Sequence, residues 1–228
     1  MLRRLLLRAL VASSVAGGAA AADPVVVELF TSQGCSSCPP ADAILGTLAD
    51  RDDVIALSFH VDYWDWIGWA DTFGAAAHTE RQRSYAHAAG TTVLYTPQFV
   101  IGGAAQVAGA DGMAVAEAVA ARAAASGEVI GLDGAGRLTL APTGRAARLM
   151  LAEVAPEATV AIEHGENAGH ALTYRNVVRG WRELGAWDGA AATVEAPAAV
   201  PGRIRVVLAQ AVDAEGLPGP VLGAIRLD

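Results

Sequence analysis

Residues Val25–Asp42 read VVVELFTSQGCSSCPPAD, and this stretch decides how the first half of the chain folds. Its apolar start, Val25–Phe30, is rich in β-branched residues and predicts a short buried strand. A polar turn ending in glycine follows, and the spacing of apolar residues then predicts a helix over residues 41–49. Two cysteines, Cys35 and Cys38, therefore lie where a strand leads into a helix.

The position of this cysteine pair predicts redox chemistry. Free backbone N–H groups and the positive end of the helix dipole stabilise a thiolate at the start of a helix, which favours Cys35 as the attacking sulfur. Cys38 is near enough in the chain to close a disulfide with it. A bridge over so small a loop stabilises a fold little through chain entropy, so a structural staple is the weaker interpretation. We expect a redox-active disulfide and no bound cofactor.

The composition indicates a packed globular protein. The chain has 228 residues, 53% of them hydrophobic, and a formal net charge of −8. This length suits one large domain or two small ones, and the apolar content argues against disorder. The negative charge disfavours nucleic acid as a partner.

The first residues have the form of a secretory signal peptide, which we place at residues 1–22. A basic cluster (Arg3, Arg4, Arg8) precedes an apolar run and small residues suited to cleavage. The alternative is an uncleaved anchor. No later apolar segment is long enough to span a membrane, so no stable span is expected after cleavage. We therefore expect a periplasmic or secreted protein, in a compartment where a disulfide persists.

The sequence up to residue 127 predicts an alternating α/β unit. Beyond the first strand and helix, we expect a strand, a polar helix, a hairpin and a last helix, at Val54–Phe59, Ala75–Ala89, Gln98–Ile101 with Ala105–Ala108, and Gly112–Ala125. The predicted order over residues 23–127 is therefore β-α-β-α-β-β-α, with Pro97 at the entrance of the hairpin.

This order, with a C-x-x-C at the first helix and a proline entering the hairpin, resembles the thioredoxin fold. The resemblance implies that the Thr96–Pro97 bond is cis and that Pro97 packs against the disulfide. In such a topology Cys35, His60 and Pro97 face one crevice. The stretches VELFTSQGCSSCPPAD, SFHVDYWDWIGWAD, TPQFVIGG and GENAGHALTYRNVV resemble more closely a secreted, thioredoxin-like bacterial family of uncharacterised proteins, known as domain of unknown function 1223.

Residues 128–228 have a different pattern. Short apolar runs alternate with turn residues, which predicts a mostly antiparallel, β-sandwich-like domain. The runs are Val129–Leu132, Leu138–Leu140, Leu149–Val154, Thr159–Ile162, Leu172–Val178, Ile204–Gln210 and Ala224–Leu227. Polar residues within this part (Asn167, Tyr174, Asn176) are interpreted as caps or interface groups, without assigned chemistry.

Glu28 is the one charged residue of the first predicted strand. It resembles the buried acid of thioredoxins that relays a proton to the resolving cysteine, a role that suits a buried carboxyl group. The resemblance therefore adds Glu28 to Cys35, Cys38 and Pro97 as a candidate catalytic residue. The alternative is a carboxylate that an arginine or the backbone satisfies.

His60 offers a second chemistry. With Cys35 and Cys38 it would form a Cys2His site suited to copper or zinc. The alternative is a histidine hydrogen-bonded beside Asp62.

The aromatic residues that follow His60 also have two interpretations. Tyr63, Trp64, Trp66 and Trp69 are either packing groups or a wall that binds a peptide substrate next to the cysteines.

Three functions remain open at this point. The first is an exported thiol–disulfide oxidoreductase that acts on cell-envelope proteins and works with a redox partner protein. The second is a copper-binding or copper-delivery protein that uses the same cysteines. The third is a non-catalytic, thioredoxin-like interaction module.

Overall fold

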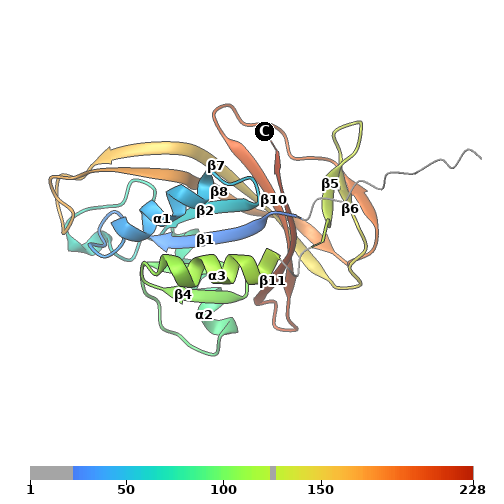
Figure 1. Cartoon of the computed structure of the whole chain (residues 1–228), viewed down its shortest axis with the longest axis horizontal. Helices are drawn as coiled ribbons and strands as arrows, with labels where there is room; N and C mark the ends of the chain where they lie inside the picture. Colours follow the sequence, from blue (N-terminus) through green and yellow to red (C-terminus); the bar gives the residue numbers. More distant parts are fainter. Residues whose placement is uncertain (1–22, 124–126, 228) are drawn as a thin grey trace, which may run out of the picture.

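The computed structural model describes residues 23–123 and 127–227, so the expected signal peptide lies outside the described residues. The first half contains the strands and helices in the order that the sequence predicts (Figure 1). Their bounds are β1 (Val25–Thr31), α1 (Pro39–Ala49), β2 (Val54–His60), the 3-10 turn η1 (Asp65–Ile67), α2 (Ala76–Ala88), β3 (Gln98–Ile101), β4 (Ala105–Ala108) and α3 (Gly112–Ala123).

The second half is built from strands alone within the described residues. They are β5 (Ile130–Leu132), β6 (Leu138–Leu140), β7 (Ala147–Ala161), β8 (Ala171–Trp187), β9 (Ala192–Val194), β10 (Ile204–Val212) and β11 (Pro218–Leu227). The sequence predicts most of them, but it misses β9.

One mixed, mostly antiparallel sheet runs through both halves of the chain. Its eight strands have the order β11-β10-β7-β8-β2-β1-β3-β4. Strands β1 and β2 are parallel, and β2 meets β8 in parallel at the pair Ser58–Val177. The sequence pattern predicts a separate sandwich after residue 127. Instead, the long strands of the second half extend the sheet of the first, because β8 pairs with β7 along one edge and with β2 along the other, with Val177 paired on both sides.

The helices of the first half cover both faces of this sheet. Alternate residues of β1 point to opposite faces, as in any strand. Val25, Val27 and Leu29 pack with α1 and α3, whereas Val26 and Phe30 lie in the core that contains Tyr85 of α2. Glu28 shares the face of Val26 and Phe30, so its side chain points toward α2 and away from α1.

A small sheet of β5, β6 and β9 packs against the far end of the large sheet. Ile130, Leu138 and Leu140 share a buried cluster with Leu151 and Val207 of the large sheet. This local face-to-face packing is the part of the second half that resembles the expected sandwich.

Strand β7 corrects the prediction of two short strands at Leu149–Val154 and Thr159–Ile162. It runs unbroken through Pro156, which reads as a strand breaker in the sequence. Proline is tolerated here because β10 pairs with β7 only as far as Val154, so one side of β7 is open beyond that residue.

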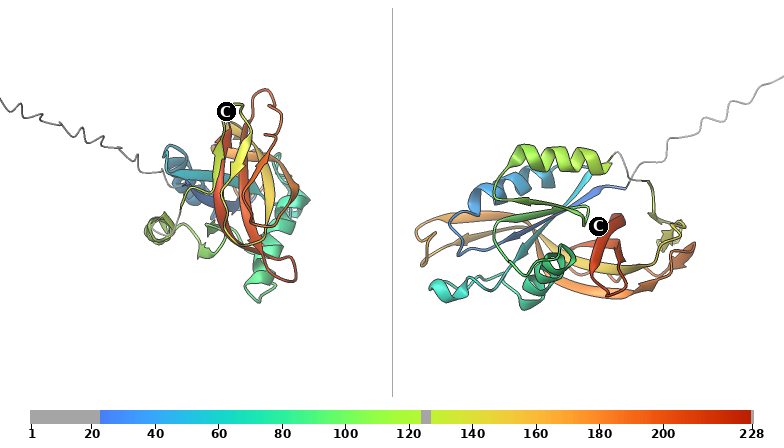
Figure 2. Two further views of the ribbon diagram at one scale, coloured as in Figure 1. Left: turned by 90° about the vertical axis from the view of Figure 1, so that its right-hand side faces the viewer. Right: turned by 90° about the horizontal axis from the view of Figure 1, so that it is seen from below.

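The β7–β8 hairpin forms an arm that spans the molecule. Figure 2 (right) shows its two strands reaching from the region of the small sheet to the opposite end, beside α1. The connection at the tip of this arm contains Glu166 and Asn167, which contact the cysteine loop of the first half.

Candidate functional site

Cys35 and Cys38 form a disulfide at the end of β1, in the loop that leads into α1. Helix α1 begins at Pro39, and Cys38 is its N-cap residue. Two prolines suit the first positions of the helix, because proline lacks an N–H group that would have no partner there. Cys35 therefore lies one turn before the helix, joined to it by the hydrogen bond from the Cys38 N–H to the Cys35 carbonyl at 3.2 Å.

The disulfide is covered, although the residues between its ends are exposed. Cys35 is 1% exposed and Cys38 is fully buried, whereas Ser36 and Ser37 face solvent. The Ser37 hydroxyl lies 3.4 Å from Cys35 Sγ. A serine hydroxyl at this distance can donate to a thiolate on Cys35 once the disulfide is reduced.

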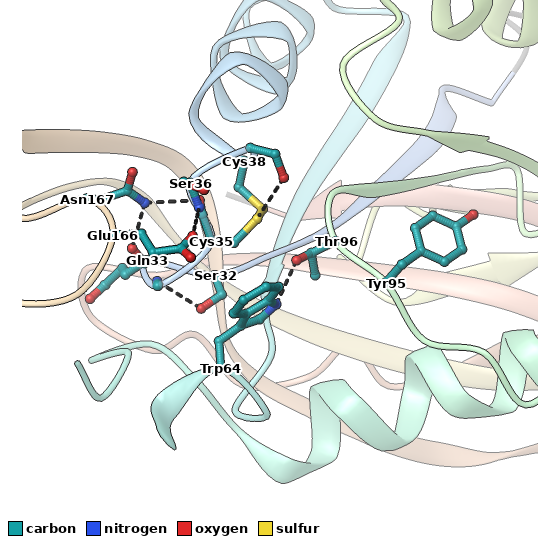
Figure 3. Close-up of a disulfide and its surroundings, with 12 residues drawn as sticks. Ser32, Gln33, Cys35, Ser36, Cys38, Trp64, Tyr95, Thr96, Glu166 and Asn167 are labelled. Atoms are coloured by element: carbon teal, nitrogen blue, oxygen red, sulfur yellow. Dashed lines mark hydrogen bonds between the residues drawn. A yellow bond between two sulfur atoms is a disulfide. The ribbon is translucent and has the colours of Figure 1, made fainter. Parts of the chain in front are cut away.

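The Thr96–Pro97 peptide bond is cis, as the resemblance implies. The Trp64 indole N–H donates to the Thr96 hydroxyl at 2.8 Å, which ties the segment after β2 to the segment before β3. Figure 3 shows Thr96 and Trp64 beside the disulfide. A Cβ at Gly34 would lie 3.3 Å from Trp64 Cβ, so the aromatic segment packs directly on the cysteine loop.

The tip of the β7–β8 arm holds the other side of the cysteine loop. The Asn167 amide donates to the carbonyls of Gln33 at 2.9 Å and Cys35 at 3.0 Å, and Asn167 is only 7% exposed. The Ser36 N–H donates to the Glu166 carboxylate at 3.3 Å. The second half of the chain thus gives the Gln33 carbonyl a donor, and it gives the Cys35 carbonyl a second donor beside the Cys38 N–H.

Glu28 lies in a buried ion pair. Arg81 donates to its two carboxylate oxygens at 2.5 and 2.8 Å, and the Tyr85 hydroxyl donates to one of them at 2.7 Å. Gln210 extends the network by donating to the Tyr85 hydroxyl at 2.8 Å. An arginine therefore satisfies Glu28, which is the alternative interpretation of this residue, and its role as a proton relay stays a prediction.

His60 is buried and bonded to Asp71 rather than to Asp62. Its Nδ1 lies 2.7 Å from an Asp71 carboxylate oxygen, and both side chains are fully buried. Burial alone would raise the pKa of Asp71, but the hydrogen bond and charge of His60 outweigh it and lower this pKa. Asp62 instead accepts a hydrogen bond from Thr79 at 2.6 Å.

Cys35, Cys38 and His60 do not form a metal site in the oxidised form that the structure describes, and the copper alternative stays a prediction. The two sulfurs are joined to each other, and Asp71 engages one ring nitrogen of His60. Among residues 23–123 and 127–227, no group of three or more His, Cys, Asp or Glu side chains is placed to hold a metal ion. We therefore derive no step through a metal.

Asp42, in the first turn of α1, is a further acidic residue with a buried carboxyl group. The residue as a whole is half-buried, but both of its carboxylate oxygens are shielded from solvent. This burial raises the pKa of Asp42 to about 7, against the lowering effects of the His60 charge and the Thr31 hydroxyl. The Asp42 carboxyl group is thus buried in the first turn of the helix that Cys38 caps, with a pKa close to neutrality.

Residues 26–210 match the family model described as "Protein of unknown function (DUF1223)". The chain belongs to this family. The crystal structure of protein AGR_C_4864 from Agrobacterium tumefaciens is similar, with 34% identity and a TM-score of 0.79 over 93% of this chain and 96% of that chain. HBP35 of Porphyromonas gingivalis, at 12% identity, is similar in fold alone, with a TM-score of 0.61 over 92% of this chain and 76% of that chain. No curated protein matches the chain.

In this DUF1223 protein, the sequence does not predict a role for Asp42 at the site, because a carboxylate in the first turn of a helix is usually a solvated group. The interpretation of Asn167 as a cap or interface group agrees with its hydrogen bonds to the cysteine loop. The contact of Glu166 with Ser36 has no signal in the sequence. No helix in the described part of the chain is long and apolar enough to cross a membrane.

Proposed function

We propose that this protein is an exported thiol–disulfide oxidoreductase with a thioredoxin-like first half, acting on protein substrates of the cell envelope. The observation that carries the proposal is the Cys35–Cys38 disulfide, which lies at the carboxyl edge of the parallel pair β1–β2 and at the start of α1. A short-range bridge at a helix N-terminus is suited to exchange and contributes little as a staple.

The arrangement around the pair supports the thioredoxin-like part of the proposal. Strands β2, β1, β3 and β4 are neighbours in this order, with β1 parallel to β2 and antiparallel to β3. Pro97 follows a cis bond and immediately precedes β3, which pairs with the cysteine-bearing strand. The cysteine loop and the cis-proline segment thus approach the same edge of the sheet.

In the proposed reaction, the Cys35 thiolate attacks one sulfur of a substrate disulfide. The substrate S–S bond breaks, a mixed disulfide forms, and the first substrate sulfur leaves as a thiolate that takes up a proton. Cys38 then loses its proton and attacks Cys35 Sγ, which forms the intramolecular disulfide and releases the second substrate sulfur. Two electrons pass from the protein dithiol to the substrate, and the reverse sequence oxidises a substrate dithiol. A redox partner protein restores the starting state.

Access to the disulfide involves the aromatic segment after β2. Because both cysteines are almost completely buried, a substrate sulfur reaches Cys35 only when the covering side chains shift. Trp64 is held by Thr96 and packs on the cysteine loop, while Trp66 on the same segment is 82% exposed. An exposed tryptophan beside a redox pair is suited to contact an unfolded or extended protein substrate.

Catalysed exchange between glutathione and a reporter protein with non-native disulfides tests the proposal. We expect the wild type to accelerate this exchange, Cys35→Ser to abolish the acceleration, and Cys38→Ser to accumulate a mixed disulfide with glutathione. Ser36→Ala, an exposed change between the cysteines, is the matched control and should keep the activity. Equal rates for the wild type and Cys35→Ser would contradict the proposal and favour the non-catalytic interaction module.

A further inference from the structure

Several buried polar atoms that lack hydrogen-bond partners gather beneath the cysteine loop. In the part of the chain that the structure describes, they include Thr31 Oγ1, both Asp42 carboxylate oxygens, His60 Nε2 and the Tyr174 hydroxyl. The Thr31 hydroxyl is nevertheless near enough to Asp42 to lower the pKa of its carboxyl group. These side chains therefore form one buried polar cluster at the carboxyl ends of β1 and β2.

The sheet register explains why these residues meet. Thr31 and His60 are direct partners across the parallel pair β1–β2, each as the last residue of its strand. The ring centroids of His60 and Tyr174 are 4.6 Å apart, which brings β8 to the same place. Asp42 comes from helix α1, which packs on this face of the sheet. The Asp42 carboxyl group interacts electrostatically with both His60 and Tyr174.

Asp42 is one helical turn from Cys38. The Asp42 N–H donates to the Cys38 carbonyl at 3.0 Å, which is the first hydrogen bond of α1 between residues four positions apart. Residues four apart lie on the same face of a helix, so the Asp42 and Cys38 side chains project from one face. The carboxyl group and the second sulfur of the pair are therefore neighbours on the buried side of α1.

The groups that face Asp42 leave it able to change its protonation state. His60 is oriented by Asp71, so its second nitrogen, Nε2, is the one left without a partner. His78 of α2 lies 2.8 Å from the His60 carbonyl and interacts electrostatically with His60, Asp71 and Arg179 of β8, and burial lowers the pKa of His78. No arginine neutralises Asp42 in the way that Arg81 neutralises Glu28 on the opposite face of the sheet.

We propose that Asp42, supported by the His60–Asp71 pair and Tyr174, accepts the proton that Cys38 loses when it resolves the mixed disulfide. This inference rests on the proposed function. The S–H bond of Cys38 breaks, its proton passes to the Asp42 carboxylate, and the electron pair left on sulfur forms the bond to Cys35 Sγ. The substrate sulfur leaves with the electrons of the mixed disulfide bond and takes a proton from solvent. When the disulfide is reduced again, Asp42 returns its proton to Cys38.

The test follows the two steps separately, with glutathione disulfide as the probe and the full chain reduced beforehand. Acid quenching and mass spectrometry give the rate at which the mixed disulfide forms and the rate at which it resolves. In the wild type, the resolving step should become faster as pH rises through about 7, because Asp42 must be ionised to accept a proton. In Asp42→Asn, this step should be about 10²-fold slower at neutral pH, with mixed-disulfide formation unchanged.

Three further measurements complete the test. Asp52→Asn, which changes an exposed aspartate in the turn after α1, should behave as the wild type. Thr31→Val removes the hydroxyl that lowers the pKa of Asp42, so it should move the pH profile upward without abolishing it. The infrared carbonyl band of a protonated carboxylic acid should titrate near neutral pH in the wild type and be missing in Asp42→Asn.

The outcomes separate this inference from the proposed function. Wild-type resolution rates and pH profile in Asp42→Asn would overturn the role of Asp42 while leaving the oxidoreductase intact. A wild type that forms no mixed disulfide would overturn the oxidoreductase itself, and the role of Asp42 with it. Absence of the titrating infrared band from the wild type would also overturn the role of Asp42, whatever the rates show.

Discussion

The Asn167 side-chain amide donates to the backbone carbonyl of Cys35 at 3.0 Å, although 132 residues separate the two in the chain. The same amide also donates to Gln33 at 2.9 Å, so one buried side chain fixes both carbonyls of the cysteine turn. The second half of the chain thereby takes part in the site through the tip of the β7–β8 arm. Its long strands position the loop that carries the disulfide.

Asn167→Ala should destabilise the fold by about 1–3 kcal/mol, because the buried Gln33 carbonyl loses its donor and the Cys35 carbonyl keeps only the Cys38 N–H. Urea denaturation measures this loss. Thr159→Ala on the exposed part of the same arm removes only a solvent-facing hydroxyl contact, so it should stay within about 0.5 kcal/mol of the wild type. Equal stabilities for the two variants would contradict the conclusion that Asn167 stabilises the cysteine loop.

Glu28→Gln should cost about 3–5 kcal/mol of stability, because it leaves the Arg81 guanidinium buried without its counter-ion. Denaturant titration provides the measurement. The control is Glu80→Gln, which breaks an exposed pair with Arg83 and should cost at most about 1 kcal/mol. If Glu28→Gln left stability unchanged but slowed disulfide exchange, Glu28 would be the proton relay that the sequence suggests.

The contribution of Asp42 to the stability of the protein should fall as pH rises from about 4 to about 7. Asp42 has a pKa of about 7 in the folded state and 3.8 as a model value, so the folded state binds more protons in this interval. The pKa of Asp23 is raised to about 6, mainly by burial, and acts in the same direction. Comparison of Asp42→Asn with the wild type therefore isolates the Asp42 contribution.

Unfolding free energies of the two proteins, at about pH 5 and about pH 8, give the measurement. At the higher pH, Asp42→Asn should be the more stable protein by roughly 1–4 kcal/mol, since it has no buried charge at this position. At the lower pH the advantage should shrink, because the wild-type carboxyl group is then protonated. A constant difference between the two proteins across this range would show that Asp42 does not titrate there.

Trp64→Phe should speed reduction of the disulfide by dithiothreitol roughly fivefold, since it removes a hydrogen bond to Thr96 worth about 1 kcal/mol. Stopped-flow measurement of thiol release follows the rate. Trp66→Phe alters an exposed ring on the same segment and serves as the control, with an unchanged rate expected. A Trp64→Phe rate equal to that of the control would argue against this segment as the cover of the disulfide.

Local patterns were enough to predict much of the first half. The strand and helix around Cys35 and Cys38 follow from β-branched residues, turn residues and helical spacing, and the structure has both. The hairpin strands Gln98–Ile101 and Ala105–Ala108 have the predicted bounds. The cis bond at Pro97 came from the resemblance, since its local sequence carries no such signal.

What the sequence could not predict depends on contacts between distant residues. Pro156 reads as a break, and only the shortness of the neighbouring β10 explains why β7 continues through it. The Glu28–Arg81 pair joins residues 53 positions apart, and the contact of Asn167 with Cys35 needs the whole arm. The burial of the Asp42 carboxylate oxygens likewise depends on how α1 packs on the sheet, which no local pattern encodes.

The most direct measurement is the reduction potential of the Cys35–Cys38 pair, determined by equilibration with reduced and oxidised glutathione. An exchange catalyst should have a potential between about −270 and −120 mV, the range of thioredoxin-like oxidoreductases. Cys38→Ser, which cannot close the intramolecular disulfide, is the control. A potential below about −300 mV, as in inert structural disulfides, would contradict the account and leave the pair as a local brace in an interaction module.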